Sequence, residues 1–81
     1  MPGYPTEYTS SVPINAELMQ HLRKLSGLNQ ARFAQVCKVS APYISHIERG
    51  RRKTISPAVY VRICNALGVK NREQLLLRDA A

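Results

Sequence analysis

The stretch APYISHIERGRRK, residues 41–53, combines side chains that bind anions with side chains that can hydrogen bond in either direction. A glycine ends its mixed segment, and three basic residues follow at once. Arginine and lysine bind phosphate groups. The serine and histidine can donate and accept hydrogen bonds, whereas the first two residues, alanine and proline, offer only apolar groups. This set predicts a binding surface for a charged partner.

The net charge indicates the same class of partner. The chain holds 12 Lys and Arg against 5 Asp and Glu, and its isoelectric point is near 10.0. Such a surface attracts polyanions, of which nucleic acid is the leading candidate, although a basic face can also serve solubility alone. Six basic residues fall within one short region, opposed there only by Glu48: Arg32, Lys38, Arg49, Arg51, Arg52 and Lys53.

Other chemistries find little support in the sequence. There is no Ser/His/Asp set, carboxylate pair, phosphate loop or metal-binding cluster, so we expect neither enzyme activity nor a cofactor. Cys37 and Cys64 each lie in an apolar helical pattern and are predicted to be reduced core residues rather than a disulfide. His21 and His46 alternate with them along the chain without the close pairing of a zinc site.

The N-terminal stretch MPGYPTEYTSSVP has no cationic start and no apolar run, so we expect no signal peptide and a cytoplasmic location. It also has too few apolar residues to pack alone. We therefore predict a flexible arm over residues 1–13, a folded domain over 14–78 and a short tail over 79–81.

Helical patterns fill the folded domain, and at 81 residues the chain is long enough for only one. Leu18, Leu22 and Leu25 follow the i, i+4, i+7 spacing of one helix face. Asn15, Asn29, Ser40 and Ser56 are predicted N-caps, and Gly27, Gly50 and Gly68 are predicted ends. Asn71 with Gln74 forms a capping-box pattern for a last helix. We predict an all-α fold of five short helices, over about 16–26, 30–37, 41–49, 57–67 and 72–77, with no strand.

Two short helices joined by the turn KVS form a helix-turn-helix pattern. The chain resembles the helix-turn-helix domain of the Cro/CI (XRE) family, which includes the lambdoid phage repressors and Cro, over nearly all of residues 18–77. The matching features are GLNQ, Phe33-Ala34, VS in the turn, IS then IERG, and YVRICNALGV, in that order. The resemblance implies that the helix over 41–49 lies in the major groove of DNA.

A helical wheel places Ile44 and Ile47 inward and the reading face opposite them. The base-contact candidates are Ala41, Pro42, Ser45 and His46. The phosphate-contact candidates are Asn29, Gln30, Tyr43, Arg49, Arg51, Arg52 and Lys53. The resemblance also implies a structural ion pair between Arg23 and Glu48, which would keep Glu48 from reading cytosine.

The sequence departs from the family pattern at two places. Family members more often carry amides where this chain has Ala41 and Pro42, so these apolar residues predict contact with a thymine methyl group. The N-terminal arm has no Lys or Arg before Arg23, so it lacks the charge of an arm that embraces DNA.

One domain of this size makes a small footprint, so we expect a homodimer on a pseudo-palindromic site. Two interpretations stay open for the apolar residues of the C-terminal half, which either form the dimer surface or all belong to the core: Ile55, Val59, Val69, Leu75, Leu76 and Leu77. Occlusion of promoter DNA favours a repressor, associated with the nucleoid when bound. The alternative is an antitoxin-like or coactivator-like module of the same fold, binding a protein through the arm or the C-terminal helix.

Overall fold

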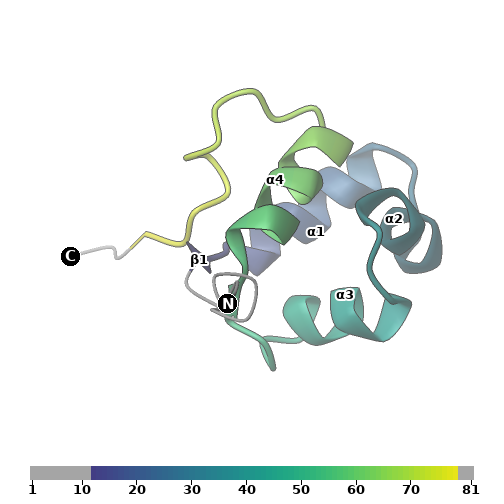
Figure 1. Cartoon of the computed structure of the whole chain (residues 1–81). Coiled ribbons are helices and arrows are strands. Elements are labelled where there is room, and N and C mark those ends of the chain that lie inside the picture. The colour runs from purple at the N-terminus through teal and green to yellow at the C-terminus, as the bar shows by residue number, and fades with distance from the viewer. Residues whose placement is uncertain (1–11, 79–81) are drawn as a thin grey trace, which may run out of the picture.

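The described part of the chain folds into four helices and a two-stranded sheet (Figure 1). The computed structural model describes residues 12–78. The elements in chain order are β1 (Val12–Pro13), α1 (Ala16–Leu25), α2 (Gln30–Cys37), α3 (Ala41–Glu48), β2 (Thr54–Ile55) and α4 (Pro57–Ala66). The predicted all-α class is confirmed in a mostly helical domain. The predicted count of five helices is wrong, and so is the expected lack of strands.

Each helix begins at a side-chain cap that the sequence predicts. The caps Asn15, Asn29, Ser40 and Ser56 accept the backbone N–H three residues later, at 2.8 to 3.3 Å. Three of the four helices are followed by a glycine with positive φ, at Gly27, Gly50 and Gly68. The exception is α2, which ends at Lys38 with φ 62°. A lysine therefore adopts the left-handed conformation that usually favours glycine.

The core lies where α2 packs against α3 and α4, and where α1 packs against α3. The fully buried side chains are Met19, Phe33, Cys37, Ile44, Ile47, Ile55, Ile63, Cys64 and Leu75. Both cysteines are free thiols inside this core, as predicted. Burial raises the pKa of the Cys37 thiol to about 11, so this thiol is neutral at ordinary pH.

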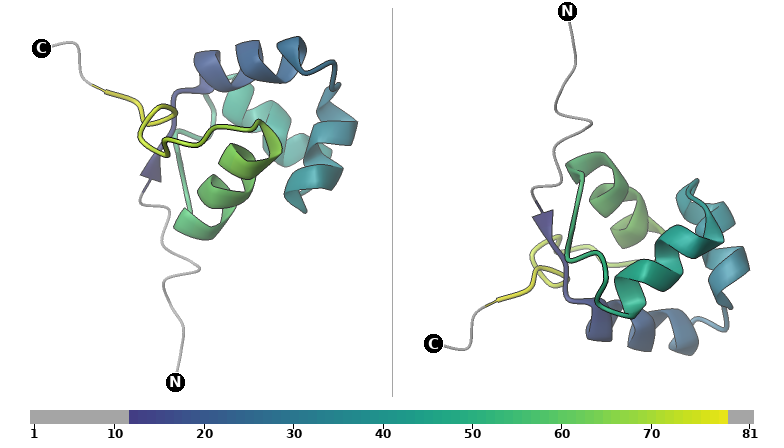
Figure 2. Two further views of the ribbon diagram at one scale, coloured as in Figure 1. Left: turned by 90° about the horizontal axis from the view of Figure 1, so that it is seen from above. Right: turned by 90° about the horizontal axis from the view of Figure 1, so that it is seen from below.

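The small sheet ties both ends of the described chain to the middle. β1 pairs antiparallel with β2, and the Ile14 N–H extends this pairing by donating to the Lys53 carbonyl at 3.2 Å. On its other side the same segment meets the C-terminal residues through a bridge between Ile14 and Leu76. Figure 2 shows the yellow C-terminal segment beside β1 in both views. None of the helices within residues 12–78 is long and apolar enough to cross a membrane.

Residues Val12 and Pro13, which the sequence assigns to the arm, are thus part of the sheet. The rest of the predicted arm, residues 1–11, lies outside the described residues, as does the predicted tail 79–81.

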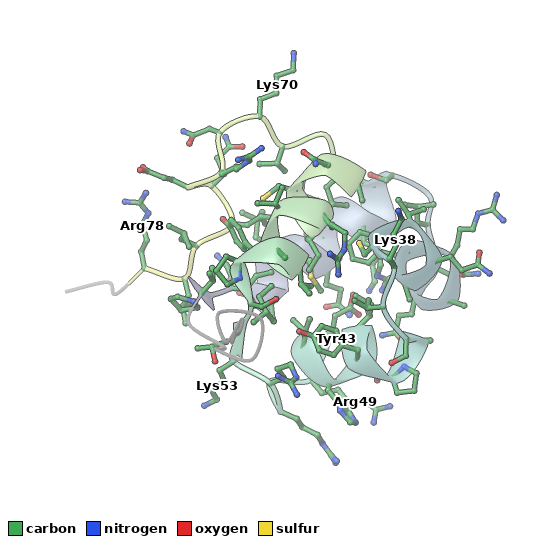
Figure 3. All side chains as sticks on the ribbon, in the orientation of Figure 1. Lys38, Tyr43, Arg49, Lys53, Lys70 and Arg78 are labelled. Carbon is green, nitrogen blue, oxygen red and sulfur yellow. The ribbon has the colours of Figure 1, made fainter. Side chains whose placement is uncertain are left out.

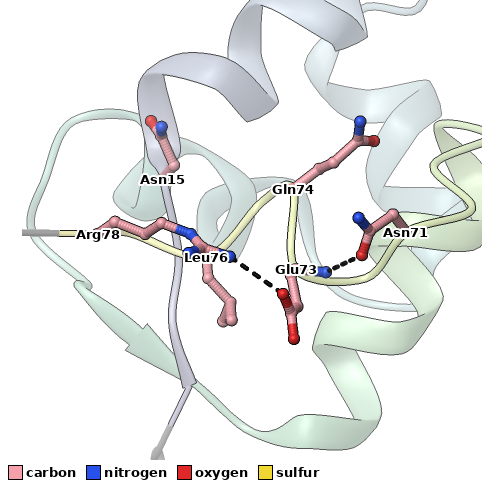
Figure 4. Close-up of a pocket in the computed structure, with 6 residues that line it drawn as sticks. All are labelled: Asn15, Asn71, Glu73, Gln74, Leu76 and Arg78. Carbon is pink, nitrogen blue, oxygen red and sulfur yellow. Dashed lines mark hydrogen bonds and ion pairs between the residues drawn. The ribbon is translucent and has the colours of Figure 1, made fainter.

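The predicted fifth helix is replaced by a turn. Asn71, its expected cap, accepts the Glu73 N–H on its side chain at 3.1 Å (Figure 4). The Asn71 carbonyl accepts the Gln74 N–H at 3.0 Å. Directly after the turn, the Leu75 carbonyl accepts the Asn15 N–H at 2.7 Å, and the Leu77 N–H donates to the Pro13 carbonyl at 2.9 Å. The Leu76 N–H also donates to the Glu73 carbonyl at 3.2 Å, so the segment consists of turns followed by pairing with the β1 segment, and the local helical pattern is overridden.

Most of the residues predicted to form the dimer surface are buried or partly buried in the domain. Ile55 and Leu75 are fully buried in the core. Val59, Val69 and Leu76 are partly buried and pack against it. Only Leu77 stays largely exposed, at 53%. Most of these apolar residues therefore stabilise the domain itself.

Candidate nucleic-acid interface

The α2–α3 pair is built around a tight turn. The Val39 N–H donates to the Ala34 carbonyl at 3.0 Å, and Lys38 supplies the left-handed residue that reverses the chain. Ala34 is 2% exposed, so this small residue belongs to the core where α2 packs against α3 and α4. Ile44 and Ile47 are fully buried and fix the inner face of α3.

The opposite face of α3 is open to solvent. Pro42, His46 and Arg49 are exposed, and Ala41 and Ser45 are half-buried. Helical geometry places four of these five side chains away from Ile44 and Ile47, with Ala41 at the margin. Three of the four predicted base-contact residues, Pro42, Ser45 and His46, therefore lie on the open face of α3, and Ala41 lies at its edge, packed against the core.

A loop of exposed basic residues, Arg51 to Lys53, folds back on the end of α3. The His46 carbonyl accepts the backbone N–H groups of both Arg51 and Arg52, at 2.9 and 3.1 Å. A shallow hollow results, lined by His46, Arg51, Arg52, Lys53 and Thr54. In Figure 3, Arg49 and Lys53 lie along the lower edge of the molecule, whereas Lys70 points away at the opposite edge. Backbone hydrogen bonds thus hold cations beside the exposed side of α3.

Tyr43 and Arg52 contact each other. The Arg52 guanidinium lies over the Tyr43 ring, 4.9 Å from its centroid. A cation at this distance is attracted by the electron-rich face of the ring. Two residues predicted as separate phosphate contacts therefore form one unit that joins the loop to α3.

On the other flank of α3, Glu48 is the acceptor for three side chains. Arg23 Nε donates to Glu48 Oε2 at 2.7 Å, and Arg23 Nη2 donates to Oε1 at 3.2 Å. Gln20 Nε2 and Gln30 Nε2 donate to the same Oε1, at 3.2 and 2.8 Å. The Glu48 and Arg23 side chains are only 2% and 8% exposed. Donors from inside the domain thus occupy the buried carboxylate, so Glu48 is not available to accept a hydrogen bond from a cytosine amino group.

We call Gln20, Arg23, Gln30 and Glu48 the Glu48 network. Sequence reasoning did not single out Gln20, although its position three residues before Arg23 places both side chains on one face of α1. Gln30 was predicted to contact phosphate, and the structure engages it with Glu48 as well. Arg23 also donates from Nη1 to the Leu28 carbonyl at 2.7 Å. The network therefore joins α1, the α1–α2 turn, α2 and α3.

The N-terminus of α2 presents further donors. Asn29 accepts the Arg32 N–H on Oδ1 at 2.8 Å, so its side-chain oxygen serves the helix, and only its amino group is left for a phosphate. The N–H groups of Gln30 and Ala31 lie in the first turn, where no intrahelical acceptor exists. Within residues 12–78, no group of three or more His, Cys, Asp or Glu side chains could hold a metal ion.

A comparison with known protein families agrees with this geometry. A family model described as a helix-turn-helix domain matches residues 16–77. No curated protein and no solved structure matches the chain. The matched region contains all four helices, including the α2–α3 pair with its open outer face. The chain belongs to the helix-turn-helix family of DNA-binding domains.

Proposed function

We propose that this protein is a sequence-specific transcriptional regulator of the Cro/CI (XRE) type, which places α3 in the major groove of double-stranded DNA. The observation that carries the proposal is the open side of α3, bordered by a loop of three exposed cations that are fixed to the helix end. A helix fits the major groove, and the cations reach the flanking phosphates.

The roles divide by chemistry. Ser45 and His46 hydrogen bond to base edges, and Ala41 with Pro42 contacts a thymine methyl group. The backbone contacts come from two places: the α2 N-terminus, with Asn29 and Gln30, and the α3 end with its loop. The second group consists of Tyr43, Arg49, Arg51, Arg52 and Lys53. Since phosphate contacts carry no sequence information, discrimination rests on the four residues of α3.

The working form is a homodimer, because a single domain buries too little surface for tight and selective binding. Leu77 supports this assignment as an exposed apolar residue that lines a hollow together with apolar residues and with Glu17, Arg52 and Lys53. A dimer of this kind binds a pseudo-palindromic operator, with the two copies of α3 about one DNA turn apart. Occupancy of such an operator within a promoter would repress transcription.

Selection of duplexes from a random pool tests the proposal. We expect one enriched motif with two-fold symmetry and a conserved thymine opposite Ala41-Pro42. If about four phosphates are neutralised per subunit, log K against log salt should fall with a slope of about −7 for the dimer. No enriched motif, together with a stoichiometric protein partner retained at high salt, would instead identify an antitoxin-like or coactivator-like module.

A further inference from the structure

We propose that Glu48 is a positioning residue for DNA binding: it holds the side-chain amide of Gln30 so that one N–H of that amide is presented to a DNA phosphate. The inference rests on the proposed function, since it specifies how α2 contacts the duplex that α3 reads. The positioning role does not follow from the Arg23–Glu48 ion pair alone or from the place of Gln30 in α2 alone. The carrying observation is the 2.8 Å hydrogen bond between Gln30 Nε2 and Glu48 Oε1.

The chemistry of Glu48 fixes which end of the Gln30 amide faces inward. An ionised carboxylate only accepts hydrogen bonds, so the amino group and not the carbonyl of Gln30 must face it. An amino group has two hydrogens, and Glu48 takes one. The second N–H belongs to a half-buried residue at the first position of α2. The amide therefore retains one donor for an acceptor outside the domain.

The surroundings of that donor suit an anion. Asn29 takes the N–H of Arg32, while the backbone N–H groups of Gln30 and Ala31 remain at the positive end of the helix dipole. A phosphate at this point would meet the Gln30 amide together with these backbone groups. Glu48 does not repel it strongly, because Arg23 neutralises the carboxylate at 2.7 Å.

The orientation of Gln30 is set before DNA arrives. Glu48 is held by Arg23 and Gln20 in addition to Gln30, and its side chain is 2% exposed. A free glutamine would lose rotamer freedom on contact with phosphate, and this loss would weaken binding by about five-fold. Glu48 removes most of that cost, because it has already ordered the side chain.

Gln20 provides a matched control. It donates to the same Glu48 oxygen as Gln30, at 3.2 Å, and is likewise half-buried. It lies in the middle of α1, where no helix N-terminus offers donors to an anion. Loss of Gln20 and loss of Gln30 therefore remove the same kind of bond to Glu48, but only the second removes a donor to DNA.

A double-mutant cycle on the folded protein, with a selected duplex and binding followed by fluorescence anisotropy, measures the coupling. We expect Q30A to weaken binding about ten-fold, as for a lost hydrogen bond to a charged group, and E48D about five-fold. The shorter aspartate keeps its charge for the long Arg23 side chain but withdraws from Gln30. In the Q30A background, E48D should cause no further loss of DNA affinity. The single variant Q20A should bind DNA as the wild type does. Should E48D not fold, the neutral pair R23M/E48M replaces it, since a buried ion pair can be exchanged as a whole and methionine offers Gln30 no oxygen acceptor.

A scan with single uncharged methylphosphonate linkages then identifies the phosphate. At one position, replacing the phosphate with methylphosphonate should lower the affinity of the wild type. The same replacement should lower the affinity of Q20A equally and leave the affinities of Q30A and E48D unchanged. Independent losses from Q30A and E48D, or no such linkage, would refute the positioning role while leaving DNA binding intact. If the wild type itself bound no duplex, the proposed function would fail first.

Discussion

The two flanks of α3 are held by opposite kinds of contact. On one flank, the Glu48 network is buried and joins α3 to α1 and α2 through four side-chain hydrogen bonds to one carboxylate. On the other flank, Arg52 from an exposed loop lies over the half-buried Tyr43. The first arrangement attaches α3 to the rest of the domain. The second is a contact at the surface, between the basic loop and α3.

The buried Glu48 network should contribute more to the free energy of unfolding than the exposed contact between Tyr43 and Arg52. Loss of one partner from a buried ion pair costs about 3 to 5 kcal/mol, because the other charge stays buried without compensation. A cation over an aromatic ring at an exposed site contributes about 0.5 to 1 kcal/mol. Substitutions on the two flanks should therefore separate effects on folding from effects on binding.

The largest expected effect is that of R23A on stability. This substitution leaves the Glu48 carboxylate, 2% exposed, with only two neutral amide donors. We expect the free energy of unfolding to fall by about 3 to 5 kcal/mol, which is a large part of the stability of so small a domain. Urea denaturation with unchanged m-value measures the change.

The double variant R23M/E48Q is the control, since it removes both charges while keeping a similar volume. It should recover most of the loss, because no buried charge then lacks a partner. If R23A were as stable as the wild type, the two flanks would not differ in the way described, and Glu48 would have access to water.

The elements that the sequence predicts well are those specified by local chemistry. Asn15, Asn29, Ser40 and Ser56 cap their helices through backbone groups three residues away, so each start can be identified from a few neighbouring residues. The inward positions Ile44 and Ile47 follow from periodicity in the same way.

Features that depend on distant partners were not predictable from local patterns. Asn71 with Gln74 has a valid capping pattern, but the pairing of residues 75–77 with 13–15 decides the backbone there. β1 and β2 are each two residues long, too short for a strand pattern to be visible. Gln30 has a predicted role at the surface. Its hydrogen bond to Glu48 joins residues 18 positions apart in the sequence, so no local pattern indicates it.

An intermediate effect is expected for His46, which lies toward the Tyr43 flank and lines the hollow beside the loop. H46A should change base preference at one or two positions of the site, with a loss of discrimination of about 1 to 3 kcal/mol.

R51A is the matched variant on the same hollow. It should weaken binding to all sequences alike and reduce the salt slope by about 1 per subunit. Competition assays with single-base variants of the selected site distinguish the two results. A uniform loss of affinity for both would show that α3 does not read the bases.

The smallest expected effect tests whether the Tyr43 flank acts through its ring or its hydroxyl. Y43A removes the surface under Arg52 and should lower the free energy of unfolding by no more than about 1 kcal/mol. The same substitution should weaken DNA binding more than it weakens folding, because the Arg52 guanidinium loses the ring it lies over beside α3, while the backbone bonds of the loop to His46 remain. Y43F keeps the ring, so it should bind as the wild type does if Tyr43 serves only to place Arg52. A loss of affinity in Y43F equal to that in Y43A would assign the hydroxyl a phosphate contact of its own. In that case both flanks of α3 would touch the DNA backbone directly, Gln30 on one side and Tyr43 on the other, and the contrast between them would be one of burial alone.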